Sequence, residues 1–436
     1  MTWREQKREL LTRAFIAGVE AAQPATMIHP DLINALFHDI DHDQPKVVVL
    51  GAGKAAASMA AALENAWSRA GLSPPLTGVV VTRDGYVCDT RLVEVVTAGH
   101  PNPDERSQAH SIRMLEIAAS LGKNDTLIGL WSGGGSSLLA APPEGVGMES
   151  LGSLTNRLIL SGATIGDLNV VRRHLSIIAG GRLAKCAAPA SVVNIIIPDV
   201  VAEGSAERQL ADVASGPCVP DPSTRKEAID VLDRLGIHSV PDIRRALLSE
   251  NSETPSTHEE IGTADIATMV LSEKTAIARA KAELRKKGFK IIQLPPMLTG
   301  EARTVANQMA DTARRHAVHN APAAILTGGE LTVTVTGDGK GGPNQEYALA
   351  LALALDGAKN ICAFAGDTDG IDGIGEAAGA FVFPDTLERM RAAGIDPEAA
   401  LANNDAGAAF EAIGDLLITG PTFTNLNDLR LIVIGG

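Results

Sequence analysis

The stretch that decides the fold is VVVLGAGKAAAS, residues Val47 to Ser58. Its four apolar residues, Val47 to Leu50, predict a buried strand, and Gly51 and Gly53 predict a tight turn into an Ala-rich helix. The first turn of such a helix presents unpaired amide groups and a positive dipole end, which together bind anions. Because Lys54 lies at this point, the stretch predicts a turn that handles phosphate. The alternative is an ordinary strand-to-helix turn with an exposed lysine.

The turn matches neither of the two common phosphate-binding fingerprints completely. A Walker A loop requires GxxxxGK followed by Ser or Thr, whereas Val48 and Ala55 occupy its first glycine position and its hydroxyl position. The dinucleotide fingerprint GxGxxG/A is matched formally by Gly51, Gly53 and Ala56. Its ribose-binding acid should follow the next strand, where Arg83 and Asp84 stand. The turn alone leaves both a nicotinamide cofactor and a nucleoside triphosphate open.

The composition limits the class of protein. At 436 residues the chain is too long for one compact core, so we expect two domains. Aromatic residues make up only 3% of the chain, so small aliphatic side chains must fill the core, as in many α/β proteins. A net charge of −14 argues against nucleic acid as the main partner. An acidic protein that binds anionic substrates must concentrate its positive charge locally.

The cysteines and the apolar runs indicate the cellular setting. The cysteines lie far apart without a CxxC pair, which argues against a zinc site and a disulfide framework and fits a reducing cytoplasm. MTWREQKREL has no apolar signal-peptide core, and no apolar run approaches the length of a membrane span. We therefore expect a cytoplasmic protein that acts on small molecules, with homo-oligomerisation left open.

Apolar runs alternate with helical patterns along the first half of the chain. After an amphipathic helix over residues 4–22, the expected strands cover residues 47–50, 78–81, 93–97, 126–131 and 191–197. This alternation is typical of a parallel sheet with helices on both faces. Ligands of open α/β sheets bind at the C-terminal ends of the strands. The Gly- and Ser-rich segments that follow these strands are therefore the candidate binding loops.

A second α/β region follows a change in composition. The segment SENSETPSTHEE predicts a surface loop or linker, and we place a domain boundary near residue 240, which gives domains over 1–240 and 241–436. The strands expected in the second domain cover residues 291–294, 323–327, 331–336, 361–364 and 429–434. Thr332 to Thr336 alternate polar and apolar β-branched residues, as a half-buried strand does.

Two clusters in the first half carry candidate anion-binding groups. In LWSGGGSSLLAAP a strand runs into Gly133, Gly134, Gly135, Ser136 and Ser137. Successive amides in such a loop form an anion nest; a nucleophilic serine is the rival, but GxSxG is absent. In LNVVRRHLSIIAGGRLAK, Arg172 and Arg173 suggest recognition of a carboxylate or phosphate, and a solvated basic helix face is the alternative.

Two further clusters lie in the second half. TGGELTVTVTGDGKGGPNQEYALALAL places Glu330 at a strand end, Lys340 in a Gly-rich loop, and Asn344 and Glu346 at a helix start. FAGDTDGIDGIGEAAGA places Asp367, Asp369 and Asp372 after a strand, a pattern that suits Mg²⁺. Plain glycine turns and Asp-Gly turns are the alternatives.

Taken together, these motifs resemble the glycerate 2-kinase family, the two-domain type whose C-terminal part is called MOFRL. Some members carry the older label hydroxypyruvate reductase. The resemblance runs nearly from end to end, and its motifs are GAGKAA at 51–56, AGHPNPDERS at 98–107, SGGGSSLL at 132–139, NVVRRHLS at 169–176, ASGPCVPDPST at 214–224, GEAR at 300–303, TGGELTVTVTG at 327–337, TDGIDG at 368–373 and TGPTFTNLND at 419–428.

The resemblance implies ATP-dependent phosphorylation of the 2-hydroxyl of D-glycerate, which gives 2-phosphoglycerate. It implies a Rossmann-like N-terminal domain, a smaller α/β C-terminal domain and an active site in the cleft between them, with ATP and Mg²⁺ as cofactors. The lysine that the family regards as important for catalysis falls on Lys54. His100 and Asn169 fall within family motifs and are further candidates for binding substrate or phosphate.

Phosphoryl transfer needs in-line positioning and charge neutralisation more than covalent chemistry. On this hypothesis Gly51, Gly53 and the 133–137 nest bind phosphate or carboxylate oxygens, and Lys54 stabilises the transferred group. Arg172 or Arg173 holds the substrate carboxylate. Asp199 or Asp369 orients the hydroxyl or holds Mg²⁺, with Asp372 as a further metal ligand.

The sequence departs from the family pattern at several loops. The usual SDVVGD is PDVVAE, which keeps Asp199 but changes the serine and the second acid. The usual GRGGRNQE is GDGKGGPNQE, with Lys340 for one arginine and Pro343 for the other. A GSN-like motif ends at Glu273 instead of Asn, and NNDS has Ala406 for its serine. A kinase of a related hydroxy acid is therefore an alternative.

Two rival functions stay open from the sequence. An NADP-dependent hydroxypyruvate reductase is supported by Gly51, Gly53, Ala56 and Arg83. A small-anion binding protein without turnover is suggested by the altered loops.

Overall fold

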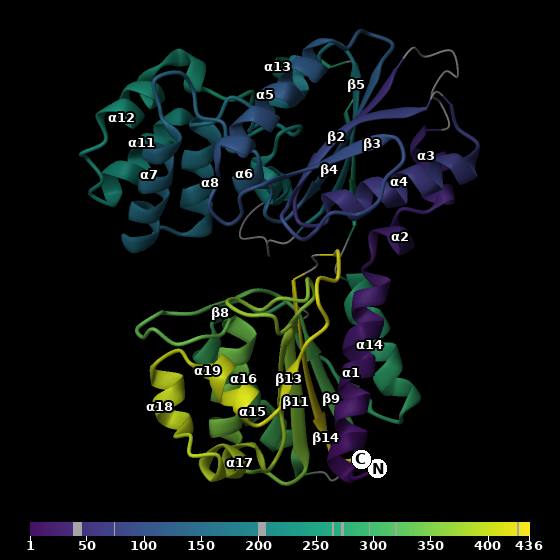
Figure 1. Ribbon diagram of the computed structural model, residues 1–436, viewed down its shortest axis with the longest axis vertical. Helices are drawn as coiled ribbons and strands as arrows, with labels where there is room; N and C mark the ends of the chain where they lie inside the picture. The colour runs from purple at the N-terminus through teal and green to yellow at the C-terminus, as the bar shows by residue number, and fades with distance from the viewer. Residues whose placement is uncertain are drawn as a thin grey trace. The chain divides into compact units, whose positions relative to one another are not determined.

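The computed structural model describes residues 1–37, 46–73, 75–198, 206–263, 266–271, 274–295, 297–318, 321–424 and 427–436. The chain forms two compact units. The N-terminal unit contains Pro24–Leu271, and the C-terminal unit contains Met1–Gln23 together with Ser272–Gly436. Their elements are labelled in Figure 1.

The N-terminal unit is built on a six-stranded parallel sheet, as the alternating pattern predicts. Its strands are β1 (Val47–Ala52), β2 (Leu76–Arg83), β3 (Val93–Ala98), β4 (Thr126–Ser132), β5 (Ser191–Ile197) and β6 (Ile266–Val270). The order is β3-β2-β1-β4-β5-β6. The chain moves outward from β1 to β3 and then returns to the other side of β1 with β4. This reversal creates a switch point between β1 and β4, where open α/β sheets bind ligands.

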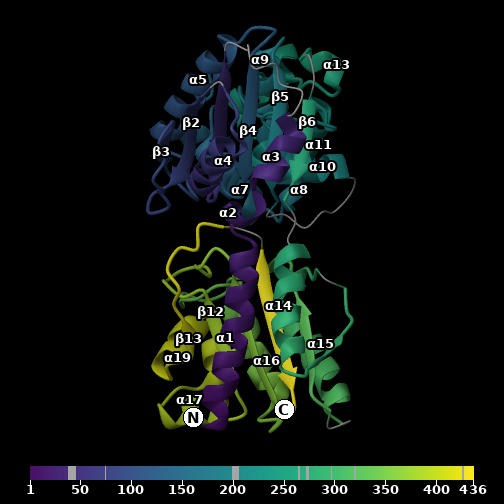
Figure 2. The ribbon, with the colours of Figure 1, turned by 90° about the vertical axis from the view of Figure 1, so that its right-hand side faces the viewer.

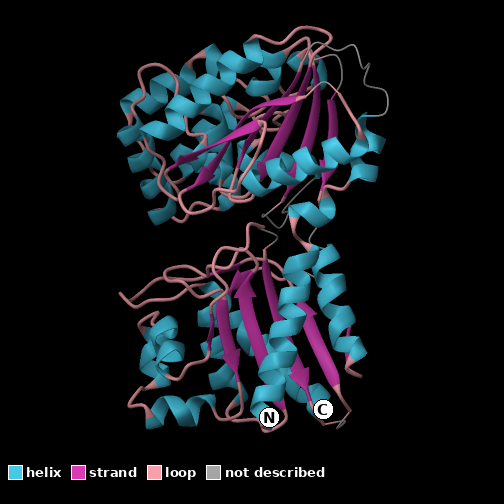
Figure 3. Ribbon diagram, turned by 45° about the vertical axis from the view of Figure 1, so that its right-hand side comes forward, coloured by secondary structure: helices cyan, strands magenta, loops and turns pink. Residues whose placement is uncertain are grey.

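Helices cover both faces of this sheet (Figure 3). Alternate residues of β1 (Val48, Leu50 and Ala52) pack with α5 (Glu105–Ala119) and α9 (Arg182–Ala187), while α4 (Ala56–Ala70) packs against β1, β2 and β4. The other helices of the unit are α2 (Pro24–Met27), α3 (Pro30–Phe37), α6 (Gly135–Leu138), α7 (Met148–Leu160), α8 (Ile165–His174), α10 (Ala206–Asp212), α11 (Arg225–Arg234), α12 (Pro241–Leu248) and α13 (His258–Ile261), with 3₁₀ turns at Val213–Ser215 and Glu250–Ser252.

A separate apolar cluster holds α7, α8, α11 and α12 together. Leu154 and Leu158 of α7 pack with Val171 of α8, Leu232 of α11 and Leu247 of α12. These buried contacts fix the orientation of α8. They leave Arg172 of α8 beside the loops that follow β3 and β4.

The C-terminal unit contains a mixed sheet in the order β13-β12-β11-β14-β9-β7. β7 and β9 pair in parallel, and the other neighbours are antiparallel. The strands of the unit are β7 (Lys290–Ile292), β9 (Ala323–Thr327), β11 (Ile361–Asp367), β12 (Gly379–Val382), β13 (Leu416–Leu417) and β14 (Asp428–Ile434), with a separate parallel pair of β8 (Gly300–Glu301) and β10 (Leu331–Thr332).

The two faces of this sheet are covered by different helices. Ala324 and Leu326 of β9 share a buried cluster with Phe15 of α1 (Trp3–Ala21) and Ile277 of α14 (Lys274–Lys286). Ile325 packs on the other face with α15 (Ala302–Ala317) and α16 (Pro343–Leu355). This is the alternation that a β-strand imposes on its side chains. Figure 2 shows α1 running beside α14. The remaining helices are α17 (Thr386–Ala392), α18 (Pro397–Ala402) and α19 (Ala406–Ala412).

The units divide at a different point from the boundary expected near residue 240. The segment expected as a surface loop or linker is mostly exposed and is held on the N-terminal unit. Thr254 donates a hydrogen bond to buried Asp221 at 3.0 Å, and the Ser252 carbonyl accepts one from His174 at 2.8 Å. β6 then completes the parallel sheet by pairing with β5. The N-terminal helix α1 was expected where it lies, but it belongs to the C-terminal unit.

The strand expected over residues 331–336 ends after Thr332. The amide of Thr334 donates to Glu301, and the amide of Thr336 donates to the side chain of Asn404 at 2.7 Å. Val335 is exposed. The alternating residues therefore form a loop held by side-chain acceptors rather than a longer half-buried strand.

Candidate active site

At the end of β1 and in the turn that follows it, two glycines let β1 and β4 approach each other more closely than residues with a Cβ would allow. A Cβ on Gly51 would lie 2.5 Å from the Leu130 carbonyl oxygen, and a Cβ on Gly53 would lie 2.1 Å from Ser132 Oγ. Gly53 also has φ of +137°, a conformation that favours glycine. Both glycines are therefore required for the packing of the two strands.

The amides of this turn already have acceptors within the protein. Gly53 donates to the Val81 carbonyl at 3.1 Å, Lys54 to the Gly133 carbonyl at 2.8 Å, and the amide of Ala55 to Ser132 Oγ at 3.1 Å. The sequence suggested that these amides face a phosphate. In the structure they join β1 to its neighbours, so the turn does not present these amides to a ligand.

The loop after β4 has the opposite character. Among the described residues, none accepts a hydrogen bond from the four successive amides of residues 134–137. Gly134 has φ of +82°, and Ser137 Oγ donates to its carbonyl at 3.0 Å. Unoccupied successive amides form a concavity suited to an anion. This loop therefore fits the predicted anion nest, whereas the turn after β1 does not.

Lys54 and His100 flank this nest. A Cβ on Gly134 would lie 2.7 Å from His100 Nε2 and 3.4 Å from Lys54 Cγ. Lys54 follows β1, His100 follows β3, and Gly134 follows β4. Three strand ends thus place a cation, an imidazole and the free amides together beside the switch point.

The turn formed by residues 214–216 also lies beside the loop after β4. Ala214, Ser215 and Gly216 have successive φ values of 51°, 60° and 61°, a left-handed run that is costly for the two non-glycine residues. Ser215 Oγ donates to Ser136 Oγ at 2.8 Å. The sequence singled out ASGPC only as part of the family resemblance; its chemical role beside Ser136 could not be inferred from residue types.

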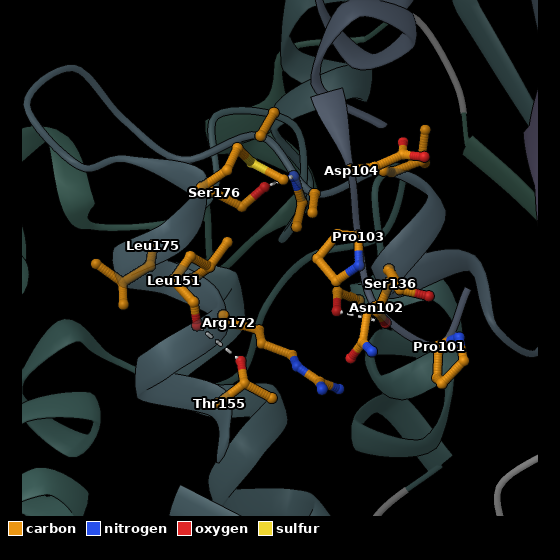
Figure 4. A pocket seen from close by; sticks show the side chains of 18 of the residues that line it. Pro101, Asn102, Pro103, Asp104, Ser136, Leu151, Thr155, Arg172, Leu175 and Ser176 are labelled. Atoms are coloured by element: carbon orange, nitrogen blue, oxygen red, sulfur yellow. Dashed lines mark hydrogen bonds between the residues drawn. The ribbon is translucent and has the colours of Figure 1, made fainter. Parts of the chain in front are cut away.

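A pocket of about 710 Å³ opens beside the nest, within the N-terminal unit. Figure 4 shows Arg172 extending into it from α8, with Asn102 and Ser136 lying on the side toward which it points. Its walls are lined by Pro101, Asn102, Ser136, Ser137, Ala140, Met148, Leu151, Gly152, Leu160, Arg172, Leu175 and Ser215, among others.

The structure separates the two arginines that the sequence left as alternatives. Consecutive residues of a helix face different directions. Arg173 is buried and paired with Asp212 at 2.7 Å and Asp221 at 3.0 Å, so it is a structural ion pair. Arg172 lines the pocket and has no carboxylate partner among the described residues. Burial lowers its pKa, so an anionic ligand would stabilise the charged guanidinium.

Asn169 lies on the same helix, one turn before Arg172. It is buried, and it does not line the pocket. The prediction that Asn169 binds substrate or phosphate therefore has no contact in the structure to support it.

The residues expected to act from the C-terminal unit are mostly engaged within that unit. Glu346 is buried, pairs with Arg303 at 2.8 Å and accepts a hydrogen bond from Asn404 at 3.0 Å. Lys340 is exposed on the Gly-rich loop, whose position is fixed by the Lys340 amide donating to Asp405 at 2.8 Å. Glu330 is exposed at the end of the loop after β9.

Asn344 and Asp372 belong to a buried polar network. Asp372 accepts hydrogen bonds from the amides of Asn344 at 3.0 Å and Gln345 at 2.8 Å, and it thereby caps α16. Asn344 Nδ2 also donates to Asp372 at 3.1 Å and to Asp428 at 2.8 Å. Burial and the neighbouring Asp428 carboxylate raise the pKa of Asp372 to about 7. Arg430 pairs with Asp428 at 2.9 Å.

Of the metal ligands predicted from the sequence, Asp369 and Asp372 lie among the described residues. Within the described ranges, no group of three or more His, Cys, Asp or Glu side chains is placed to hold a metal ion. Both oxygens of Asp372 accept hydrogen bonds from the start of α16, and Asp369 Oδ1 accepts one from the Ile371 amide at 2.8 Å. Asp199, Ala202, Glu203 and Glu273 lie outside the described residues.

Fold and site together define an open-sheet α/β protein with a glycine-rich loop and a lysine at its switch point. The chain belongs to the glycerate 2-kinase family. Residues 10–249 match the model of a domain of unknown function, DUF4147, and residues 323–428 match the MOFRL family.

Relatives and solved structures agree with this assignment over nearly the whole chain. The D-glycerate 2-kinase of Thermotoga maritima is 38% identical over 417 residues, which are 92% of this chain and 95% of that protein. A putative hydroxypyruvate reductase of Agrobacterium vitis is 42% identical over 442 residues, with 100% and 96% covered. The crystal structure of glycerate kinase from Thermotoga maritima matches with a TM-score of 0.83 at 36% identity, covering 99% of this chain and 100% of that one.

None of the helices in the described part of the chain combines the length and the apolar character needed to cross a bilayer.

Proposed function

We propose that this protein is an ATP-dependent D-glycerate 2-kinase. The observation that carries the proposal is the group of four amides at residues 134–137, for which the described part of the chain supplies no acceptor, beside the Lys54 side chain. Such a site suits a transferred phosphoryl group, whose charge lies on several oxygens. The kinase names of relatives that share nearly the whole chain support the same reaction.

The proposed reaction joins the 2-hydroxyl oxygen of D-glycerate to the γ-phosphorus of ATP. The bond from that phosphorus to the bridging oxygen breaks, ADP leaves, and the hydroxyl proton passes to a base. Catalysis of this step is mainly positioning and charge stabilisation. We assign oxygen binding to the amides of residues 134–137 and charge stabilisation to the Lys54 ammonium group.

Three further residues are assigned to the reaction. His100 adjoins the nest and is proposed as a ligand of the phosphate oxygens. Asp199 is proposed to orient the hydroxyl or accept its proton. Lys340 is proposed as a further cation for the reaction, since it stands on an exposed Gly-rich loop in place of a family arginine.

Mg²⁺ is the usual companion of ATP, but the described residues do not fit a protein-built site for it. The oxygens of Asp372 are committed to capping α16, and Asp369 accepts a hydrogen bond from its own loop. Mg²⁺ commonly keeps several waters and binds through substrate phosphates with one or two carboxylates. We therefore derive no step through a metal held by Asp369 or Asp372.

Two observations weigh against a nicotinamide-dependent reductase. The amides that a dinucleotide-binding turn offers to a pyrophosphate are bonded to Val81, Gly133 and Ser132. The acid that should hold a ribose, Asp84, is paired with Arg106 at 3.0 Å. These contacts favour the kinase.

A cytoplasmic setting is part of the proposal. Its support is that all four cysteines are free thiols, Cys88, Cys186, Cys218 and Cys362.

The test is release of ADP, measured by a coupled assay, over a panel of D-glycerate, L-glycerate, hydroxypyruvate, tartronate and tartrate. We expect D-glycerate to be the preferred acceptor, and ³¹P NMR to identify 2-phosphoglycerate as the product. NADPH oxidation with hydroxypyruvate is measured in parallel. Turnover in that second assay, without ADP release in the first, would establish the reductase instead.

A further inference from the structure

We propose that the pocket beside the nest binds the nucleotide, with the base against the apolar side chains of one wall and the phosphates toward Arg172 and Ser136. This inference rests on the proposed function, because ATP is the phosphoryl donor there. It assigns Arg172 to the donor rather than to the substrate carboxylate that the sequence suggested.

The size of the pocket suits a nucleotide better than a three-carbon acid. Its volume of about 710 Å³ falls within the range of about 300–1,000 Å³ that is typical of sites for drug-sized ligands and cofactors. A three-carbon hydroxy acid would leave most of this volume to water. A nucleotide, with a base, a ribose and a phosphate chain, matches it in size.

The side chains that line the pocket also favour a nucleotide. One wall carries the apolar side chains of Met148, Leu151 and Leu160 of α7 and of Leu175 at the end of α8, interspersed with polar residues of α7 that include Thr155 and Asn156. Figure 4 shows Asn102 and Ser136 on the side toward which Arg172 points, and Ser215 also lines the pocket. A purine has broad apolar faces, whereas D-glycerate carries a polar group on every carbon. The apolar side chains of this wall therefore have a use with a nucleotide and none with the acceptor.

Arg172 marks the polar end of the pocket. Its guanidinium is partly buried, points into the pocket in Figure 4, and has no carboxylate partner among the described residues. A planar guanidinium binds phosphate oxygens through paired hydrogen bonds. Ser136, on the same side, is two residues from Gly134, which adjoins Lys54. A phosphate chain that starts at Arg172 is thus directed toward the proposed catalytic lysine.

Gly152 offers a direct probe of the pocket. It lies within α7 and lines the pocket, and a Cβ built on it meets no atom within 4 Å. A larger side chain can therefore enter the pocket without moving the backbone. Gly166→Trp is the matched control, because Gly166 lies on α8 outside the pocket lining and a Cβ built there meets Thr164 Oγ1 at 3.7 Å, an ordinary contact.

The experiment measures ADP binding to the full chain by calorimetry, together with KM for ATP and for D-glycerate. We expect Gly152→Trp to weaken ADP binding and to raise KM for ATP by about tenfold or more, with KM for D-glycerate within about twofold of the wild type. Gly166→Trp should resemble the wild type in all three values. Circular dichroism and a thermal melt establish that each variant is folded.

Arg172→Gln supplies a second readout that does not depend on filling the pocket. We expect it to raise KM for ATP and the Kd of ADP about tenfold or more, while KM for D-glycerate changes little. A selective rise in KM for D-glycerate in either variant, with ADP binding unchanged, would overturn the inference. So would a wild-type protein that does not bind ADP. If ADP binds as described but no hydroxy acid is phosphorylated, the proposed function fails and the pocket assignment stands.

Discussion

The close approach of β1 and β4 makes Gly53 the most demanding backbone position of the site. Replacing it with alanine places a Cβ 2.1 Å from Ser132 Oγ and 2.5 Å from the Ser132 carbonyl oxygen, at a φ of +137°. Backbone strain of this kind costs about 1–3 kcal/mol, and forced overpacking costs about 1–3 kcal/mol more. We therefore expect Gly53→Ala to destabilise the protein by about 2–6 kcal/mol.

Gly71→Ala is the matched control, because it separates backbone strain from the steric clash. Gly71 ends α4 with φ of +71°, and a Cβ there meets no atom within 4 Å. Its replacement should cost only the strain, about 1–2 kcal/mol. Thermal unfolding of the full chain, followed by calorimetry, measures both. For a unit of this size each kcal/mol corresponds to about 2–4 °C in Tm. If Gly53→Ala lowered Tm no more than Gly71→Ala does, the reasoning about strand contact would be refuted.

Three further predictions concern other parts of the chain. Arg173→Met should destabilise the protein by about 3–5 kcal/mol, because it leaves the buried Asp221 carboxylate without its arginine partner. Arg172→Met should change Tm little. Equal shifts in Tm for the two variants would contradict their different roles. The pKa of Asp372 in the folded protein is about 7, above its ordinary 3.8. Its contribution to the free energy of unfolding is therefore greatest below about pH 4 and is lost as the pH rises to about 7. At 1.36 kcal/mol per pKa unit the loss is up to about 4 kcal/mol. Asp372→Asn should remove that dependence, and an unchanged slope of stability between pH 4.5 and about 8 in urea titrations would show the assignment to be wrong. Lys340→Met should lower kcat in the ADP-release assay without changing Tm, since the side chain is exposed; a wild-type kcat would remove Lys340 from the reaction.

Local pattern was enough to predict most of the N-terminal unit. Val47–Leu50 and Ser191–Ile197 are apolar runs bounded by turn residues, and both are strands of the parallel sheet. β6 was missed because Ile266–Val270 follows a polar stretch and gains its place only by pairing with β5. The compact units divide after Leu271 for a related reason: the fixed position of Thr254 depends on Asp221, which no local pattern reveals.

The candidate site was predictable in its residue types but not in its geometry. The glycines at 51, 53 and 133–135 look alike in sequence, yet the first two serve strand packing, whereas the amides of residues 134–137 donate to none of the described residues. Arg172 and Arg173 differ only by the direction that α8 gives them. Asp372 suggested a metal site, but its oxygens are fixed by the start of α16. Such roles depend on neighbours distant in the chain.

The central claim is that Lys54 stabilises the phosphoryl group held by the amides of residues 134–137. The most direct measurement is kcat/KM for Lys54→Met with ATP and D-glycerate, compared with the wild type and with Lys123→Met, which removes an exposed lysine elsewhere. We expect Lys54→Met to lose about 10²–10³-fold, as removal of a preorganised charge-stabilising group does, with Tm unchanged within about 2 °C. Lys123→Met should match the wild type. Wild-type kcat/KM in Lys54→Met would contradict the account.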